Sequence, residues 1–503
     1  MSKSLDRAVI YAFALSLCGV SINVAAETPI EEVVLEIRPA SDPQPALRYT
    51  LLPPYSQRTP GNAATVYLRA TTIYDQAYDR FSRELDKEEK LDPVVDWLKT
   101  KPAELPRAEV QNYLARFDDA WAELAIAARR SYCAWDYPVR EQRENLFGIL
   151  LPEMQTMRGL GRVTALRARL AIADGDFDQA MHALQTGYAL ARHAAEQPFL
   201  VSGLVGIAIA EQMHQQVLAM TEAPGSPNLY WALTALPHPL IDLRGPLELE
   251  SESVFLMFPE LDEARRHALA ASSRSGAMSD EDWNSLMQRF LRRFQGNNLF
   301  VPDAASEPGS VDLRGAIQSI GMQAYVLTKI GMARERLVGA GRTAEAVEKM
   351  SAGEVVLLHT AETYLDLRDD LFKWFYLPYW QARASLEQAD NDVAKRCQER
   401  EILPLASLLL PAIGNARRAQ ARGERRLVEL QTIESLRYFA AAHGGKFPGR
   451  LDQIVDHPAL INPMTGQSLV YRVEGKTAIL EAIEDAQAAP RRYRIVCAES
   501  TAK

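Results

Sequence analysis

Hydrophobic residues recur at steps of three and four along most of this chain, which is the period of a helix that buries one face. The pattern starts at Ala63 and resumes after each polar interruption until about residue 442. Its first face comprises Val66, Leu68, Ile73, Ala77, Tyr78 and Phe81. Further helices are predicted over 90–99, 107–134, 146–173 and 281–294, and again from 313 onward. The pattern therefore predicts a mainly α-helical body.

Residues 200–220 form a helix of a different kind, because the first half of the segment is apolar on every side. Gly203 and Gly206 allow neighbouring helices to approach closely. Charged and amide residues follow from Glu211 onward, which makes the segment too polar to span a bilayer. We expect a central buried helix.

The pattern changes character over residues 402–503. An apolar run leads into a basic stretch and then into an amphipathic helix, whose inner face comprises Leu427, Leu430, Ile433, Leu436 and Phe439. His443, Gly444 and Gly445 end that helix. Alternating apolar and polar residues then predict three short antiparallel strands. The sequence therefore predicts a small C-terminal α+β domain behind the helical body.

Residues 162–198 carry the clearest supersecondary pattern, a helix that ends at Gly175 and a second helix that Asp176 can cap. The inner face of the second helix comprises Phe177, Ala180, Leu184 and Gly187. This segment resembles the helical hairpin of a tetratricopeptide repeat. Its first half departs from that family, because Thr164, Arg167 and Ala171 replace Trp, Leu and Tyr. No second copy follows at the repeat period, so the resemblance implies one hairpin in a bundle.

The C-terminal 402–503 segment resembles the pilin and type II pseudopilin family. The resemblance rests on the apolar-to-basic helix, the His443–Pro448 turn and the Asn462–Gly466 segment before a strand pair. It implies a long helix packed on a small sheet. The apolar run is internal and is interrupted by Pro404 and Pro411, so a membrane-spanning pilin helix is not expected.

The first 26 residues have the features of a secretory signal peptide. Lys3 and Arg7 precede an apolar run from Ala8 to Val20, and small residues at 24–26 suit cleavage before Glu27. Residues 27–62 follow with one short predicted strand and then a proline-rich stretch. Proline favours an extended arm that wraps over a surface. We expect an exported protein, periplasmic or extracellular, that is not integral to the membrane after cleavage.

Composition narrows the class of protein further. The chain has 503 residues, of which 47% are hydrophobic, and a formal net charge of −9. This charge argues against nucleic-acid binding, because such affinity depends on neutralising phosphates. Cys133, Cys397 and Cys497 remain after the signal peptide, too few for a disulfide-stapled scaffold. They are either unpaired core residues or include one bridge.

Changes in composition divide the chain into six segments. They are a signal peptide (1–26), an extended arm (27–62), a helical domain (63–264), a polar linker with one helix (265–312), a helical segment packed on the body (313–401) and the pilin-like domain (402–503). The predicted fold is thus mainly α, a helical-hairpin or bundle body with a small C-terminal α+β domain.

Two helical pairs could contribute to a metal site. Glu211 and His214 lie three residues apart, as do His359 and Glu362, and this spacing is used by carboxylate–histidine sites in helical bundles. The same pairs occur by chance in a helix-rich, acidic chain, where they form a solvated face or stabilise the helix. We therefore predict no metal and no other cofactor. If the protein does bind a metal ion, these four residues are the candidate ligands.

A second set of candidates consists of aromatic and basic residues. Phe372, Trp374 and Trp380 belong to the densest aromatic run, which either contributes to the core or forms a binding platform. Arg418 and Arg422 belong to an arginine run with Arg417, Arg425 and Arg426. Glu424 and Glu429 interleave with these arginines, so we expect a solvated helix face. The alternative is a surface for anionic lipid or polymer.

The sequence contains no GxSxG, HExxH or glycine-rich phosphate motif. The leading prediction is an exported, non-enzymatic envelope protein that binds a protein partner through a helical surface. One alternative is a metal-dependent enzyme or metal-binding protein, and the other is a lipid or envelope-polymer binder.

Overall fold

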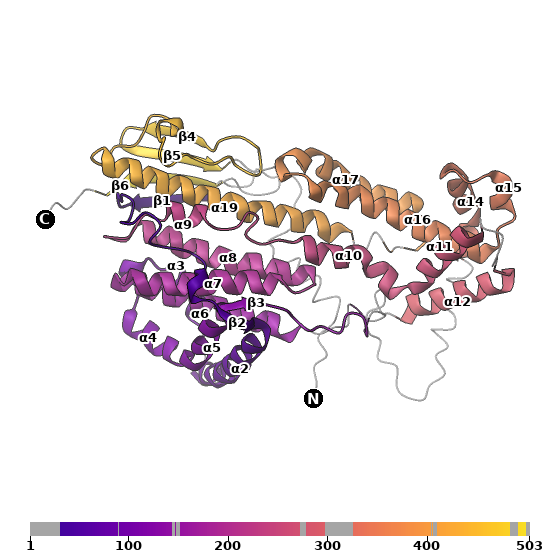
Figure 1. Cartoon of the computed structure of the whole chain (residues 1–503), viewed down its shortest axis with the longest axis horizontal. Coiled ribbons are helices and arrows are strands. Elements are labelled where there is room, and N and C mark those ends of the chain that lie inside the picture. The colour runs from indigo at the N-terminus through magenta and orange to yellow at the C-terminus, as the bar shows by residue number, and fades with distance from the viewer. Residues whose placement is uncertain are drawn as a thin grey trace.

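The computed structural model describes residues 31–88, 90–142, 146, 151–271, 278–296, 325–403, 405, 410–482 and 491–498. The predicted signal peptide lies outside these residues. The described chain is mostly helical and carries a small sheet built largely from its C-terminal part, as predicted (Figure 1).

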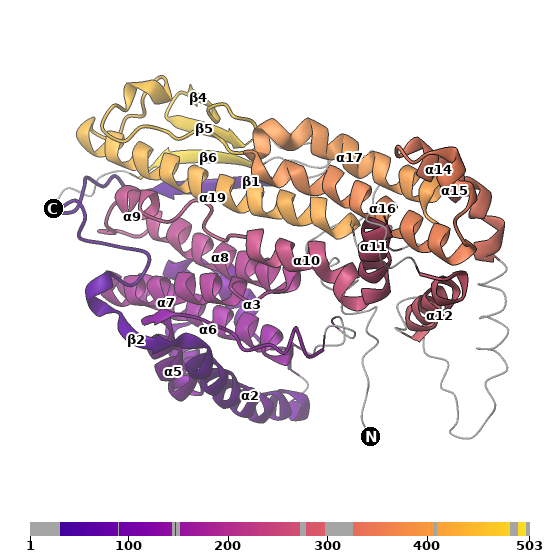
Figure 2. The same cartoon turned by 45° about the vertical axis from the view of Figure 1, so that its right-hand side comes forward.

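The N-terminal half is a stack of helices. Its elements are α2 (Ala63–Glu88), α3 (Val94–Lys99), α4 (Arg107–Ala115), α5 (Asp118–Ala128), α6 (Pro152–Asp174), α7 (Phe177–Ala195), α8 (Leu200–Thr221) and α9 (Tyr230–Thr234). α2 and α5 form the outer layer, α6 and α7 lie behind them, and α8 packs on both α6 and α7 (Figures 1 and 2). The stack therefore makes α8 a central helix.

The prediction of one helix over 107–134 is wrong. α4 ends at Ala115 and α5 begins at Asp118, and residues Arg130–Tyr132 form strand β3. β3 pairs with β2 (Thr59–Asn62), and the Asn62 side chain accepts from the Ala134 amide (2.8 Å) and donates to the Ala134 carbonyl (2.7 Å). A contact with a segment some 70 residues away thus overrides the local helical period.

Small residues let α6, α7 and α8 pack closely. Gly175 ends α6 in the left-handed conformation (φ 73°), and the Asp176 side chain caps α7 by accepting from the Gln179 amide (3.0 Å). A Cβ on Gly206 of α8 would lie 2.6 Å from the Ala191 carbonyl oxygen of α7. The predicted close approach at Gly206 is therefore confirmed. No helix in the described ranges is both long enough and apolar enough to span a membrane.

The other half of the molecule is arranged around one helix, α16 (Ala352–Phe372). Its neighbours are α10 (Arg244–Met257), α11 (Pro259–Ala271), α12 (Asp280–Gly296), α14 (Ile330–Gly339), α15 (Ala344–Glu348) and α17 (Tyr379–Arg400). α11, α12, α14 and α17 all contact α16. The helix predicted over 281–294 is α12, and the predicted boundary at residue 265 falls inside α11.

The longest helix, α19 (Pro411–Ala442), lies between the helical stack and a four-stranded sheet (Figure 2). The strands are β1 (Glu31–Ile37), β4 (Val470–Glu474), β5 (Thr477–Ala482) and β6 (Arg491–Cys497), in the order β1-β6-β5-β4. β4, β5 and β6 are antiparallel, as the alternation predicts. β1 adds to β6 in parallel, so the N-terminal strand completes the C-terminal sheet.

Short 3₁₀ segments and the N-terminal arm complete the fold. The 3₁₀ segments are η1 (Tyr55–Gln57), η2 (Pro102–Glu104), η4 (Lys373–Tyr376) and η5 (Leu451–Gln453). After β1 the arm crosses α19, where the Ala40 amide donates to the Arg437 carbonyl (3.2 Å). It then reaches α7, where Gln185 donates to the Thr50 carbonyl (3.0 Å). The arm thus holds sheet and stack together before α2 begins.

Arg437 of α19 is the most completely buried cation in the described chain, with no exposed surface. Its guanidinium donates to both Glu434 carboxylate oxygens (2.9 and 2.8 Å) and to the Arg38 carbonyl (2.8 Å). It also donates to the Pro227 carbonyl (3.2 Å) and the Ser226 hydroxyl (2.7 Å). One residue therefore joins α19, the arm and the loop before α9.

The expectation of a solvated arginine face on α19 is wrong. Arg418, Arg425 and Arg426 are only 7%, 4% and 4% exposed. Arg425 and Arg426 pair with Glu429, which is fully buried, at 2.8 and 3.0 Å. Tyr493 of β6 donates to the same carboxylate (2.7 Å). Arg425 and Arg426 are buried because α8 of the stack covers one side of α19 and Tyr493 of the sheet contacts another, whereas Arg418 faces Asp390 of α17.

Candidate functional site

The first predicted metal pair lies on α8 in the helical stack. Glu211 forms an ion pair with Arg426 (3.4 Å), and His214 Nδ1 lies 2.8 Å from the Tyr188 hydroxyl of α7. His214 is 1% exposed. Burial, assisted by the Arg426 charge, lowers the pKa of His214 to about 3. His214 is thus a neutral, hydrogen-bonded core residue.

The second predicted metal pair lies on α16, in the other half of the molecule (Figures 1 and 2). His359 Nε2 donates to the Arg400 carbonyl of α17 (2.7 Å), and Glu362 pairs with Arg342. The structure therefore does not bring the two pairs together. Across the described ranges, no three His, Cys, Asp or Glu side chains lie close enough to hold a metal ion.

The three aromatic candidates flank the turn between α16 and α17. Phe372 packs on the core with its ring 6.0 Å from that of Phe375, and Lys373 covers the Trp374 ring at 5.3 Å. Trp380 is 45% exposed. A Cβ on Gly466 would lie 2.6 Å from the Trp380 indole, so the indole packs on that turn. Trp380 thus joins α17 to the C-terminal domain.

The two arginine candidates differ in environment. Arg418 is buried and lies 3.7 Å from the Asp390 carboxylate, and Arg422 is half-buried. Their neighbour Arg417 lies over the rings of Phe375 and Tyr379, at 5.7 and 6.0 Å. The aromatic and arginine runs therefore meet at Arg417, whereas Arg418 faces the protein interior.

The three cysteines of the described chain are all free thiols. Cys133 and Cys397 are buried, and Cys497 is half-buried. Burial raises the pKa of all three, that of Cys397 to about 12. Such thiols are protonated at neutral pH, so none has the character of a nucleophile.

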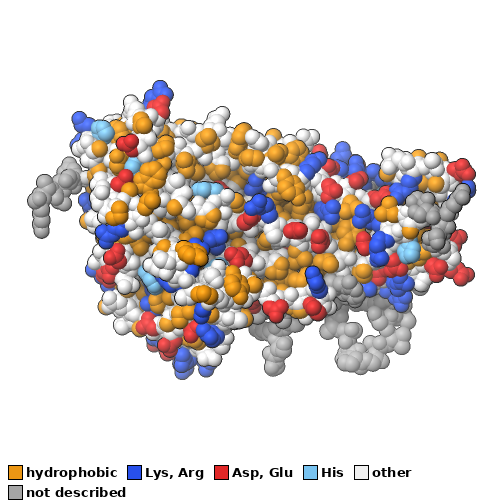
Figure 3. Space-filling model, viewed as in Figure 1, with side chains coloured by type: hydrophobic (Ala, Val, Ile, Leu, Met, Phe, Trp, Pro, Cys, Tyr) orange, Lys and Arg blue, Asp and Glu red, His pale blue; other side chains and the backbone are white. Residues whose placement is uncertain are grey.

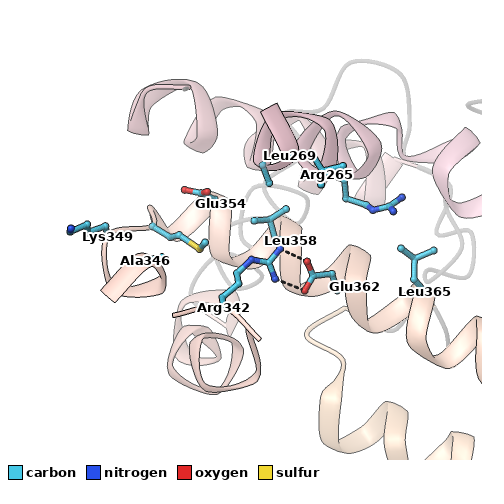
Figure 4. A pocket seen from close by; sticks show the side chains of 11 residues that line it. Arg265, Leu269, Arg342, Ala346, Lys349, Glu354, Leu358, Glu362 and Leu365 are labelled. Atoms are coloured by element: carbon cyan, nitrogen blue, oxygen red, sulfur yellow. Dashed lines mark hydrogen bonds and ion pairs between the residues drawn. The ribbon is translucent and has the colours of Figure 1, made fainter. Parts of the chain in front are cut away.

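An open pocket of about 470 Å³ lies between α11, α15 and α16 (Figure 4). Its apolar lining comprises Ala268, Leu269, Ala346, Met350, Leu358 and Leu365. Its charged lining comprises Arg265, Arg342, Lys349, Glu354 and Glu362. We call this set the α16 pocket. Leu269 of α11 and Leu358 of α16 point toward each other across it (Figure 4).

Local sequence explains how Arg342 reaches the α16 pocket. Gly341 has a φ of 100°, which ends α14, and the Thr343 hydroxyl caps α15 by accepting from the Ala346 amide (3.2 Å). Arg342 is therefore held between two helix ends. From there it makes a two-pronged pair with Glu362, in which Nη1 donates to Oε2 at 2.8 Å. This contact raises the pKa of Arg342.

Glu354 occupies the first turn of α16. Ser351 caps this helix by accepting from the Glu354 amide (3.2 Å). Burial raises the pKa of the Glu354 carboxyl, whereas Arg342 and a backbone hydrogen bond with Ser351 oppose that shift. The pattern Ser-x-x-Glu is typical of a helix start, and here the Ser351 hydroxyl makes the capping bond with the Glu354 amide. The Glu354 amide thus has a structural partner of its own.

The α16 pocket has the chemistry of a binding site. Its lining contains no Ser, Thr, Cys or His, and its Glu362 carboxylate is committed to Arg342. It therefore offers no nucleophile with an adjacent base. An apolar floor with a charged rim is instead typical of a surface that binds a peptide or protein.

Of the residues that line the pocket, the sequence indicated only Glu362. It indicated Glu362 as a metal ligand and not as part of a pocket. The remaining lining residues come from α11, α15, the residues that flank α15, and α16, and they span residues 265–365. The Ser351–Glu354 pattern is a detectable signal, but it predicts the start of a helix. No local pattern predicts that α11 lies beside α16.

Comparison of the chain with protein-family models, with curated proteins and with solved structures found no match in any of the three. The functional interpretation therefore rests on the residues themselves, on their contacts and on the two local resemblances described above.

Proposed function

We propose that this protein is an exported, non-enzymatic binding protein of the cell envelope that holds a segment of a protein partner in the α16 pocket. The observation that carries the proposal is the combination of an open apolar floor with a rim of both charge signs. Protein interfaces combine an apolar centre with a polar rim in this way.

The exposure of the pocket favours a protein segment over an enclosed small ligand. Leu269 is 72% exposed although it lines the pocket. A pocket for a small molecule buries most of its ligand, whereas a surface for a peptide leaves one side of the bound segment open. A volume of about 470 Å³ accommodates a few side chains.

Two sequence features support the remaining parts of the proposal. The leader-like first 26 residues favour export, and the tetratricopeptide-like segment 162–198 is of a type that often serves protein recognition. Mixed charges surround exposed hydrophobic groups on the visible surface, as on folded proteins in general (Figure 3). The pilin-like segment is consistent with a role at the cell surface.

The two alternative functions have less support. A metal-binding role would draw on Glu211, His214, His359 and Glu362, each of which already has a protein partner. A lipid or polymer surface would draw on Trp380 and the arginines, of which Arg418 is directed to Asp390.

The experiment is photo-crosslinking in the native host from a reactive amino acid at Leu269. The matched control places the same amino acid at Leu91, which is 91% exposed and outside the pocket. We expect one defined protein adduct at position 269 that is absent at position 91. Leu269→Glu should weaken binding of that protein, and Leu91→Glu should not. Identical adducts at both positions, or none at 269, would contradict the proposal.

A further inference from the structure

Three cations line the α16 pocket, and two of them have carboxylate partners within the protein. Arg342 pairs with Glu362 and also attracts the Glu354 carboxyl, whose pKa is raised by burial. Lys349 pairs with Glu345 at 2.8 Å and points away from the opening (Figure 4). Arg265 remains. Among the described residues no carboxylate lies within ion-pair distance of its guanidinium.

The structure orients this guanidinium. Arg265 Cζ lies 5.5 Å from the centroid of the Phe255 ring, and that ring in turn meets the Tyr364 ring edge-on at 5.9 Å. Stacking on an aromatic face leaves the N–H edge of a guanidinium available, and that edge matches the two oxygens of a carboxylate. Arg265 is therefore held as a donor.

Arg265 also lies beside the apolar part of the pocket. It precedes Leu269 by four residues on α11, so the two side chains share one helix face at a spacing of roughly 5–6 Å between Cβ atoms. Leu358 faces Leu269 from α16 (Figure 4). An occupant that uses both features needs an anionic group and an aliphatic group about one helical turn apart.

We propose that the partner segment binds the α16 pocket through a carboxylate on Arg265 and a neighbouring aliphatic side chain between Leu269 and Leu358. This inference rests on the proposed function and names the chemistry of the segment, an acidic residue close to Leu, Ile, Val or Met. A carboxylate is favoured over a phosphate because one guanidinium neutralises the single charge of a carboxylate but not the nearly two charges of a phosphate.

The test measures the photo-adduct at Leu269 in three backgrounds of the full chain. Arg265→Glu should lower the adduct yield about tenfold, because it places a carboxylate against a carboxylate. Arg265→Lys should lower it less, because a lysine keeps the charge without the planar donor edge. Arg266→Glu, the control on the next residue of α11 and outside the pocket lining, should leave the yield within about twofold.

A second step identifies the partner group. Mass spectrometry of the adduct should give a peptide with an acidic residue near an aliphatic one, and exchange of that acid for arginine should restore the adduct in the Arg265→Glu protein. An unchanged yield in Arg265→Glu would overturn the carboxylate inference and leave the proposed function intact. A fatty-acid adduct in place of a peptide would overturn the protein source. No adduct in the unaltered protein would overturn both proposals.

Discussion

α19 and the α16 pocket place the same kind of residue in opposite situations. Arg437 on α19 has no exposed surface, and its three guanidinium nitrogens all have partners within the protein. Arg342 at the pocket is 28% exposed and has one partner, Glu362. Complete burial requires complete pairing, because an unpaired charge in the interior is costly. Partial exposure removes that requirement, and so the pocket can keep Arg265 for another molecule.

The charges of the two regions differ in role, because those on α19 hold the fold together and those at the pocket are placed for recognition. The charges on α19 join segments that are far apart in sequence, such as Arg38, Ser226 and Arg437. The charges at the pocket surround an open apolar floor. Substitutions on α19 should therefore change stability, whereas substitutions at the pocket should change binding. Four variants test this contrast.

The largest effect is expected for Arg437→Met. The substitution leaves Glu434 buried with no cation, and loss of one partner from a buried pair costs about 3–5 kcal/mol. Urea unfolding of the mature protein measures the change in the free energy of unfolding. Arg265→Met is the matched control and should change it by less than about 0.5 kcal/mol. Equal losses in the two variants would remove the distinction between the regions.

Gly206→Ala tests the close packing behind α19. Its new Cβ would lie 2.6 Å from the Ala191 carbonyl oxygen, and a backbone atom cannot move aside as a side chain can. We expect a loss of about 3 kcal/mol, the upper end of the usual range for overpacking. Gly423→Ala, in open space within α19, should stabilise by about 0.5–1 kcal/mol. Thermal unfolding of the two variants should shift in opposite directions.

His214 makes the stability of the stack depend on pH. Its pKa is lowered from 6.5 to about 3 in the folded protein. Between these pH values the unfolded chain therefore binds a proton that the folded protein does not bind. Stability is full above pH ~6.5 and falls as the pH drops toward 3, by about 2 kcal/mol from pH ~6.5 to ~5. His214→Gln should remove that part of the slope. Tyr188→Phe, which removes the hydrogen bond and keeps the imidazole, should retain it.

The smallest effect on stability is expected for Arg342→Ala. The pair with Glu362 is partly exposed, and such pairs contribute about 0–1 kcal/mol. The variant frees the Glu362 carboxylate in the pocket that also holds Arg265, so the adduct at Leu269 should fall while urea unfolding hardly changes. Arg266→Ala, on α11 and outside the pocket lining, is the control and should leave the adduct unchanged. A stability loss like that of Arg437→Met would show that the pocket is as tightly constrained as α19.

Sequence periodicity predicted most of the helices and the three C-terminal strands, because each of these signals is local, but it missed the break between α4 and α5 and the strand β3. It could not predict that the polar face of α19 is buried. The apolar residues Leu427, Leu430 and Ile433 indicate that one face of α19 is buried. The residues that bury its polar face, Glu211 and Tyr493, are distant in sequence and leave no local signal. The same limit applies to the α16 pocket, which depends on how α11 is placed against α16.

The pairing of β1 with β6 has a consequence for the order in which this protein is made. The Arg491–Glu31 ion pair, at 2.8 Å, joins residues 460 positions apart. The ribosome therefore makes the first strand of the sheet long before its neighbour, and that strand stays unpaired until 460 further positions have been translated. The sheet is therefore complete only once residues 491–497 have been made, and a product truncated before them leaves Glu31–Ile37 without its partner strand.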